Sequence, residues 1–241
     1  TCAFTLSSHG YIKRMPVDTY RTQSRGGRGV NAQNLKEEDF VKSLTIASTH
    51  DYILFFTDMG KVHLRKGYQI PEAGRTARGT AIVNVLPLEA GESVTAMVIT
   101  REFDDNEFLM MVTRKGTVKR IPFIALKTNR KTGIRAITLE EGDHLINVIR
   151  TNGNDNILLA TAQGMAICFN ENDVRPMGRD AAGVRGISLS DGDFVVGAEK
   201  AEEGKTLLTV TVNGYGKRTE LSEYLRTGPN GEKCAQSRGG K

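Results

Sequence analysis

Phe108-Leu109-Met110-Met111-Val112-Thr113-Arg114-Lys115-Gly116 is an apolar run of β-forming residues that ends in a glycine turn. This pattern predicts a strand and a tight hairpin, because glycine supplies the positive φ that such a turn needs. The same turn, a hydroxyl residue, two further residues and a glycine, recurs along the chain, and each copy follows an apolar run. The turn glycines are Gly10, Gly60, Gly116, Gly164 and Gly214. The chain is therefore predicted to be an array of repeats of about 50 residues each.

Two further features follow most of these hairpins. A strand that begins with glycine comes first, as in Gly133-Ile134-Arg135 and Gly183-Val184-Arg185. An acidic turn and a closing apolar strand come next, as in 139–146. Each repeat thus offers four short strands, which is one propeller-like blade, and blades must stack around an axis to bury both faces. No segment has a sustained helical period, so we expect no long helix.

We therefore predict an all-β fold, a propeller-like ring of four-stranded blades, with residues 1–241 in one domain. The expected blades span approximately 1–50, 51–105, 106–154, 155–204 and 205–241. The last is expected to be incomplete, because the sequence there lacks the acidic turn and the closing strand. On this basis the chain is interpreted as part of a longer array.

Composition excludes several classes of protein. No apolar run approaches the roughly 18 residues of a membrane helix, and the N-terminal residues do not have the pattern of a signal peptide. The three cysteines are odd in number, far apart and outside any CxxC motif, which argues against a disulfide framework and a zinc site. A reduced, cytoplasmic compartment is expected. The chain has no tryptophan and only 6% aromatic residues, which disfavours single-stranded nucleic acid relative to duplex.

Positive charge recurs at one place in the repeat. Lys13-Arg14, Lys119-Arg120 and Lys217-Arg218 take the third and fourth places after the turn glycine, and the loops that follow are also basic. The acidic residues gather in the other turn of each repeat, and the net charge is +5. Stacked blades would then present an interrupted basic belt suited to phosphates. The alternative is that these charges only protect sheet edges from pairing.

One basic loop has a distinctive composition. Gln23-Ser24-Arg25-Gly26-Gly27-Arg28-Gly29 combines glycines that let a ligand approach the backbone with two guanidinium groups suited to phosphate. Alone, Arg-Gly-Gly is weak evidence and is compatible with a flexible turn. A near copy, residues 236–241, stands at the matching place of the fifth repeat.

The loop resembles the signature box, Gln-Arg-Arg-Gly-Gly-Arg-Gly, of the C-terminal domains of DNA gyrase A subunits. It matches at every place except Ser24, where that family usually has a basic residue. Segments similar to those domains occur along essentially the whole chain, among them Gly10-Tyr11-Ile12-Lys13-Arg14, Arg175-Pro176-Met177-Gly178-Arg179 and Gly214-Tyr215-Gly216-Lys217-Arg218. The resemblance implies a β-pinwheel, normally of six blades with five present here, that binds, bends and wraps duplex DNA around its rim.

The resemblance also implies the setting of the domain. The whole enzyme is an ATP-dependent type II topoisomerase that introduces negative supercoils, and this domain is its non-catalytic part. ATP and magnesium act elsewhere in that enzyme, so no cofactor is expected here. The expected partners are duplex DNA, the rest of the gyrase A subunit, and the gyrase B subunit. The domain itself is expected to be monomeric, in the bacterial cytoplasm at the nucleoid.

The predicted DNA contacts are the loop at 23–29 and the basic residues at matching places of the other repeats. The full set is Lys13, Arg14, Gln23, Ser24, Arg25, Gly26, Gly27, Arg28, Gly29, Lys61, Arg65, Lys66, Arg75, Arg78, Lys119, Arg120, Lys127, Arg130, Lys131, Arg179, Lys217, Arg218, Arg238 and Lys241. His63 stands where other hairpins have a basic residue and is expected to face solvent or make a minor phosphate contact.

Catalytic and metal-binding residues are not expected. The four histidines are scattered without a partner pattern, and the segment 214–217 lacks the spacing of a phosphate-binding loop.

Two other functions remain as alternatives. One is the equivalent domain of topoisomerase IV, and the nearly intact box disfavours it. The other is a kelch-like scaffold that binds protein, since kelch repeats are also about 50 residues long. The absence of tryptophan, and of a Gly-Gly pair in every repeat, argues against the kelch-like scaffold.

Overall fold

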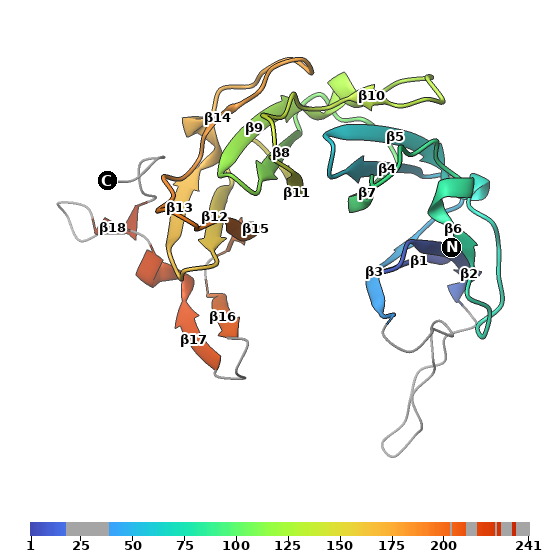
Figure 1. Cartoon of the computed structure of the whole chain (residues 1–241), viewed down its shortest axis with the longest axis horizontal. Helices are drawn as coiled ribbons and strands as arrows, with labels where there is room; N and C mark the ends of the chain where they lie inside the picture. The colour runs from blue at the N-terminus through green and yellow to red at the C-terminus, as the bar shows by residue number, and fades with distance from the viewer. Residues whose placement is uncertain (18–38, 203, 211–215, 225, 228–232, 235–241) are drawn as a thin grey trace. The chain divides into compact units, whose positions relative to one another are not determined.

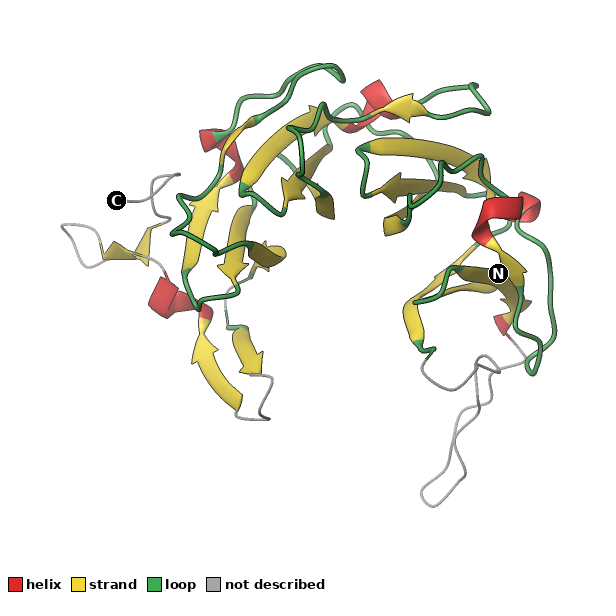
Figure 2. Ribbon diagram, in the orientation of Figure 1, coloured by secondary structure: helices red, strands yellow, loops and turns green. Residues whose placement is uncertain are grey.

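The computed structural model describes residues 1–17, 39–202, 204–210, 216–224, 226–227 and 233–234 (Figure 1). Strands and short 3-10 turns form its regular structure (Figure 2). The strands are β1 Cys2–Ser7, β2 Tyr11–Pro16, β3 Val41–Ala47, β4 Tyr52–Thr57, β5 Lys61–Lys66, β6 Thr80–Ala81, β7 Val94–Thr100, β8 Phe108–Thr113, β9 Thr117–Pro122, β10 Ile134–Arg135, β11 Leu145–Thr151, β12 Asn156–Thr161, β13 Ala166–Asn170, β14 Val184–Arg185, β15 Val195–Ala201, β16 Thr206–Val210, β17 Gly216–Glu220, β18 Arg226–Thr227 and β19 Lys233–Cys234. The 3-10 turns are η2 Gly67–Gln69, η3 Ile82–Asn84, η4 Phe123–Leu126, η5 Glu171–Asp173 and η6 Leu221–Tyr224.

The hairpins predicted from the repeated turn are confirmed. In the hairpin of β8 and β9, the amide of Gly116 donates to the carbonyl of Thr113 at 3.1 Å, and Gly116 has a φ of 88°. The hydroxyl of Thr113 accepts from the amide of Thr117 at 3.1 Å, which explains the hydroxyl residue at the start of the motif. Gly10, Gly60 and Gly164 have the same backbone conformation, and Gly214 lies outside the described residues.

The acidic turns supply carboxylates that accept hydrogen bonds from the hairpin turns. The carboxylate of Asp143 accepts from the amides of Lys115 and His144, and Asp193 accepts in the same way from Gln163 and Phe194. In the first repeat, burial opposes ionisation of Asp39, but hydrogen bonds from the Ser8 hydroxyl and the His9 amide lower its pKa to about 2. A carboxylate that caps the hairpin turn in the first, third and fourth repeats therefore explains why acidic residues gather at that end of the repeat.

Each complete sheet takes its outer strand from the next repeat, which corrects the prediction that one repeat makes one blade. The first sheet has the order β3-β1-β2-β6, and the third has the order β11-β8-β9-β14. The outer strands β6 and β14 belong to the second and fourth repeats, and they pair antiparallel with β2 and β9. The hydrophobic pattern identifies β14 as a strand, whereas in the second repeat the strand is Thr80–Ala81 and the apolar segment Ile82–Asn84 forms the 3-10 turn η3. The pattern contains the partner of neither strand, so it does not predict the exchange.

Close backbone approach explains the glycine before each outer strand. Gly79 has a φ of 96°, and a Cβ at this position would lie 2.6 Å from the carbonyl oxygen of Ile12. Gly183 has a φ of 91°, and a Cβ there would lie 2.5 Å from the carbonyl oxygen of Val118. Only glycine allows the incoming segment to lie against the hairpin strand with this backbone.

The chain divides into two compact units. The first comprises Thr1–Phe103 with Lys127–Ile134, and the second comprises Asp104–Leu126 with Arg135–Lys241. The prediction of a single domain over 1–241 stays a prediction. Among the described residues, no helix is long and apolar enough to span a membrane.

Within each unit, neighbouring sheets pack face to face. In the first unit, Phe4 and Leu6 of β1 pack with Ile53 and Phe55 of β4. In the second, β8 and β12 form the equivalent layer through Met110, Val112, Ile157 and Leu159. Side chains from both faces of a strand are buried in this way, which explains the continuous apolar runs of the sequence.

Candidate nucleic-acid interface

We use the name outer loops for residues 73–79, 127–133 and 177–183, which precede the outer strands β6, β10 and β14. They occupy the same place in the second, third and fourth repeats as the box at 23–29 does in the first. The box itself lies outside the described residues, as do Arg238 and Lys241. The outer loops are therefore where the predicted contacts can be tested against geometry.

Lys13 does not face solvent, which corrects its prediction as a phosphate contact. Its side chain lies on β2 and is 0% exposed. The ammonium donates to the carbonyl oxygens of Gly74 at 3.0 Å, Arg75 at 3.1 Å and Ala77 at 2.8 Å. Three acceptors satisfy the three N–H donors of a lysine, so this group fastens the outer loop 73–79 and has no donor left for a phosphate.

Lys119 repeats this arrangement in the second unit and requires the same correction. It is 0% exposed, and its ammonium donates to the carbonyl oxygens of Ala136 at 2.7 Å, Arg179 at 2.7 Å and Ala181 at 3.0 Å. Burial lowers the pKa of Lys119 to about 8, with Asp180 raising it and Arg179 lowering it further. We call Lys13 and Lys119 the buried lysines.

His63 takes the aligned place in the second repeat and is also 0% exposed, so the expectation that it faces solvent is wrong. Its ring lies beside the outer loop 127–133, where a Cβ on Gly133 would come within 2.7 Å of Cε1. Burial and the neighbouring Arg65 lower the pKa of His63. The loop is instead fastened by Arg65, whose Nη2 donates to the carbonyl oxygen of Lys131 at 2.9 Å.

The arginines that follow the buried lysines are also engaged within the fold. Arg14 donates from Nε to the carbonyl oxygen of Ile70 at 2.7 Å and pairs with Glu72 at 3.2 Å. Arg120 is only 5% exposed and pairs with the fully buried Glu171 at 3.1 Å. Its guanidinium also lies 3.9 Å from the ring centroid of Phe108. The prediction of Arg120 as a phosphate contact is therefore corrected as well, because its guanidinium group is buried and already paired with the Glu171 carboxylate.

The other predicted cations of β5 are partly exposed and partnered. Lys61 pairs with Glu89 at 2.8 Å. Lys66 lies 3.5 Å from the ring centroid of Tyr52 and donates to the carbonyl oxygen of His50 at 3.0 Å. A phosphate contact by either side chain would exchange one of these contacts for it, and it stays a prediction.

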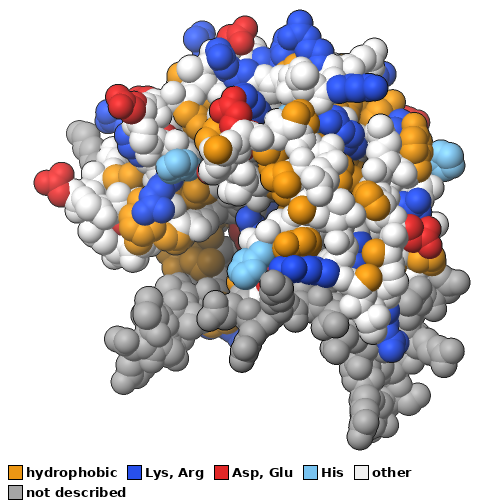
Figure 3. Space-filling model, turned by 45° about the vertical axis from the view of Figure 1, so that its right-hand side comes forward, with side chains coloured by type: hydrophobic (Ala, Val, Ile, Leu, Met, Phe, Trp, Pro, Cys, Tyr) orange, Lys and Arg blue, Asp and Glu red, His pale blue; other side chains and the backbone are white. Residues whose placement is uncertain are grey.

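The cations carried by the outer loops reach solvent. Arg75, Lys127, Arg130 and Lys131 are exposed. Arg78 and Arg179 are half-buried, and Arg78 lies 3.8 Å from the ring centroid of Tyr11. Lys217 and Arg218 of β17 are exposed as well. On the face drawn in Figure 3, lysine and arginine side chains stand out at several separate places, with only a few acidic side chains among them.

Exposed cations at one further repeated place are absent from the set predicted from the sequence. Arg135 and Arg185 are the second residues of β10 and β14, and both are exposed. They stand at matching places directly after Gly-Ile and Gly-Val. That shared place is the signal that could have found them, since a cation repeated at one position of the array belongs with the other repeated cations.

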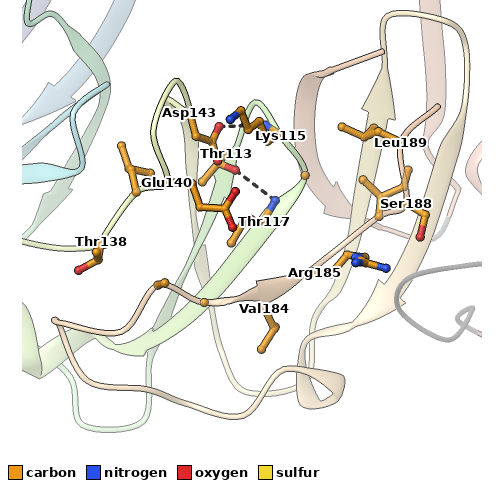
Figure 4. Close-up of a pocket in the computed structure, with 15 residues that line it drawn as sticks. Thr113, Lys115, Thr117, Thr138, Glu140, Asp143, Val184, Arg185, Ser188 and Leu189 are labelled. Carbon is orange, nitrogen blue, oxygen red and sulfur yellow. Dashed lines mark hydrogen bonds between the residues drawn. The ribbon is translucent and has the colours of Figure 1, made fainter. Parts of the chain in front are cut away.

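A hollow of about 620 Å³ lies at the hairpin-turn end of the second unit. Thr113, Lys115, Glu140, Asp143 and Arg185 are among its lining residues (Figure 4). Asp143 accepts from the amide of Lys115 at 2.9 Å, and the ammonium of Lys115 donates to the carbonyl oxygen of Glu141 at 2.6 Å. These polar groups serve the turn itself, and the hollow also reaches the end of the outer loop 177–183 at Ala182 and Gly183.

A family model for the DNA gyrase C-terminal domain, a beta-propeller, matches residues 3–48, 51–101, 107–152, 155–202 and 205–241. The chain belongs to this family. The all-β, propeller-like fold and the resemblance to DNA gyrase A subunits are thereby confirmed. The DNA gyrase A subunit of Clostridium acetobutylicum is 49% identical over 98% of this chain, and that of Staphylococcus epidermidis is 46% identical over 95%. The chain spans 28% and 26% of the length of these two relatives.

Solved structures of this class have the same fold. The crystal structure of the C-terminal domain of DNA topoisomerase IV matches with a TM-score of 0.82 at 26% identity, over 100% of this chain and 71% of that one. The structure of a DNA gyrase A C-terminal domain matches with a TM-score of 0.72 at 26% identity, over 99% and 75%. The relatives with higher sequence identity are gyrase A subunits, which favours the gyrase family over the topoisomerase IV and kelch-like alternatives.

Proposed function

We propose that this chain binds duplex DNA through the cations of its outer loops and of β17, and bends the duplex from one blade to the next. The observation that carries the proposal is the exposure of Arg75, Lys127, Arg130 and Lys131 on loops at one repeated place. The hairpin cations Lys13, Lys119 and Arg120, by contrast, are buried in the fold. Exposed positive charges that recur on outer loops with a fixed backbone suit duplex DNA, whose phosphate charges recur along its length.

Phosphate binding supplies the free energy in this proposal. Each neutralised phosphate releases condensed counterions, and guanidinium groups match phosphate oxygens with two parallel hydrogen bonds. Bending a site of roughly 20–30 bp by about 40–90° costs about 1–6 kcal/mol, which several such contacts offset. The helices among the described residues are single 3-10 turns, so we expect little reading of base sequence.

The proposal extends to the protein that contains the domain. We infer that the domain wraps DNA within the A subunit of a DNA gyrase, a type II topoisomerase that uses ATP and magnesium elsewhere to introduce negative supercoils. The rest of that polypeptide and the gyrase B subunit then serve as its partners. A single copy of the domain would act at the bacterial nucleoid.

The test measures the affinity of the unaltered chain for duplex DNA over a series of salt concentrations. The triple variant Arg75→Ala, Arg130→Ala, Lys131→Ala should bind more weakly and lower the slope of log affinity against log salt by up to about 0.9 for each lost contact. Lys115→Ala is the matched control, because this exposed lysine lies at the hairpin-turn end. An unaltered chain that does not bind duplex DNA, or a triple variant with an unchanged slope, would contradict the proposal.

Wrapping is tested separately from affinity. A relaxed plasmid, bound by the chain and then treated with a type I topoisomerase, should keep a net change in linking number of one sign. Binding without any change in linking number would reduce the proposed function to backbone binding.

A further inference from the structure

The buried lysines reach the backbone of the residues proposed to touch DNA. The ammonium of Lys13 donates to the carbonyl oxygen of Arg75 itself, and that of Lys119 donates to the carbonyl oxygen of Arg179 itself. Arg75 and Arg179 stand at the same place of their outer loops, four residues before the loop glycine. In both units, a fully buried cation of one repeat holds the backbone of an arginine of the next, exposed in the case of Arg75 and half-buried in the case of Arg179.

Each of these loops is fastened at two points. Gly79 and Gly183 lie against the backbone of the hairpin strand, where a Cβ would come within 2.6 Å and 2.5 Å of a carbonyl oxygen. The second point is the ammonium, which also bonds the carbonyl oxygens of Ala77 and Ala181, two residues before the same glycines. The arginine backbone is therefore fixed from both sides before any ligand arrives.

We propose that Lys13 and Lys119 are positioning residues for DNA binding, each holding one outer loop so that its arginine is oriented toward phosphate. This inference rests on the proposed function. It assigns the buried lysines an indirect role, since both are 0% exposed and neither can touch a phosphate while the loop is in place. A preorganised arginine does not lose backbone freedom on binding, so removing one ammonium should weaken DNA binding about tenfold.

A double-mutant cycle separates positioning from the two other roles a lysine could have. The four chains are the unaltered protein, Lys119→Met, Arg179→Ala and the double variant, each measured for affinity to duplex DNA at one salt concentration. If Lys119 acts through Arg179, then Arg179→Ala should cost several-fold in the unaltered protein and much less in the Lys119→Met background. A direct phosphate contact by Lys119 would instead give additive losses.

Amide hydrogen exchange supplies the readout that a general loss of stability would not move. Lys119→Met should raise exchange in residues 177–183 and leave the outer loop 73–79 unchanged, and Lys13→Met should do the reverse. Lys115→Met is the matched control, because it removes an exposed ammonium by the same substitution. It should leave both loops and DNA affinity unchanged.

The outcomes distinguish this inference from the proposed function. If the unaltered chain does not bind duplex DNA, both fail. If it binds, but the two methionine variants bind equally well or their losses add to those of the arginine variants, only the positioning role is overturned. Loss of fold in both variants would also overturn it, because positioning requires the blade to stand without the ammonium. Coupled losses with loop-specific exchange would establish it.

Discussion

The outer loops 177–183 and 127–133 occupy the same place in consecutive repeats, yet different residues fasten them. Lys119 holds the first from the third place after its turn glycine, fully buried. Arg65 holds the second from the fifth place after its own turn glycine, partly exposed, while the buried His63 takes the place of the lysine. The acceptors match, since Ala181 and Lys131 both stand two residues before the loop glycine.

The two loops have in common a carbonyl acceptor in the loop and a cation on the preceding hairpin. The residue that supplies the cation differs between them. The carbonyl two residues before the glycine accepts from a positive side chain of the preceding hairpin in both cases. The loop with the partly exposed fastener carries three exposed cations, Lys127, Arg130 and Lys131, whereas 177–183 carries the half-buried Arg179. Of these two loops, the one with the less buried fastening thus carries more exposed charge.

The greatest loss of stability is expected from breaking the ion pair between Arg120 and Glu171, next to Lys119. The hairpin of β4 and β5 cannot form this pair, because Leu64 stands at the place of Arg120. Glu171 also accepts from the Thr151 hydroxyl and the amides of Gly153 and Asp155. Glu171→Gln leaves the Arg120 charge buried without its partner charge and should lower the free energy of unfolding by about 3–5 kcal/mol.

Urea denaturation measures this loss, and Glu72→Gln is the matched control. Glu72 pairs with Arg14 in a setting where the carboxylate is exposed, so its loss should cost at most about 1 kcal/mol. Equal costs for the two variants would mean that burial does not set the strength of the Arg120–Glu171 pair.

Gly183→Ala and Gly133→Ala compare the two loops at their shared glycine. Both residues have a positive φ, which costs alanine about 1–2 kcal/mol. At Gly183 the new Cβ would also lie 2.5 Å from the Val118 carbonyl oxygen, a backbone clash that adds about 1–3 kcal/mol. At Gly133 the closest atoms belong to the His63 ring, at 2.7 and 2.8 Å, and the nearest backbone atom, the Val62 carbonyl oxygen, lies further away at 3.0 Å.

We therefore expect Gly183→Ala to be the more destabilising of the two in urea denaturation. Gly178→Ala is the control, because a Cβ there would meet nothing within 4 Å. A larger loss at Gly133 would show that His63 is held as rigidly as backbone, and the two fastenings would then be equivalent.

Local features of these loops could be predicted from the sequence, whereas their partners could not. The turn glycines, the hydroxyl residue and the apolar strands follow from short-range sterics and hydrogen bonding, and the described hairpins confirm them. The acceptors of Lys13 lie 61 to 64 residues further along the chain, and nothing in a local pattern contains them. For the same reason, the sequence identifies β14 as an element of its own repeat and not as the edge of the preceding sheet.

The burial of Lys13 and Lys119 contradicts the expectation that these lysines face solvent. That expectation is the ordinary one, because lysine is almost never fully buried unless it is paired. One signal is present in the sequence. The place of Lys13 and Lys119 is taken by His63 in the second repeat and by Ile167 in the fourth. An isoleucine at this place indicates a side chain that points inward, and Ile167 is buried in the structure.

His63→Lys tests whether a single change makes the two fastenings alike. A lysine at this place should reach the outer loop 127–133 as Lys119 reaches 177–183, and should slow amide exchange in 127–133 several-fold. The gain in unfolding free energy should stay below about 1 kcal/mol, because Arg65 already holds the Lys131 carbonyl and repels a second cation. His50→Lys, at an exposed histidine, is the control. Faster exchange in 127–133 would mean that the loop needs the neutral ring.

A further difference is expected from the pH dependence of the Lys119 fastening. Burial holds the pKa of Lys119 at about 8, whereas the unfolded chain keeps the ordinary value of 10.5. Between these two values the unfolded chain binds more protons than the folded chain, so the Lys119 contribution to stability rises with pH. Below pH 8 both states carry the proton and the contribution is constant.

The unaltered chain should therefore gain stability relative to Lys119→Met as the pH is raised from about 7 to about 9.5, the range that spans the folded-state pKa. Every other group that titrates in this range is common to the two chains, so its effect cancels in the difference between their urea midpoints. The neutral amine keeps two of its three N–H donors, so exchange in 177–183 should rise only slightly over the same range. A difference that is flat across the range, or that falls with pH, would show that the three carbonyl oxygens stabilise the ammonium more than burial opposes it.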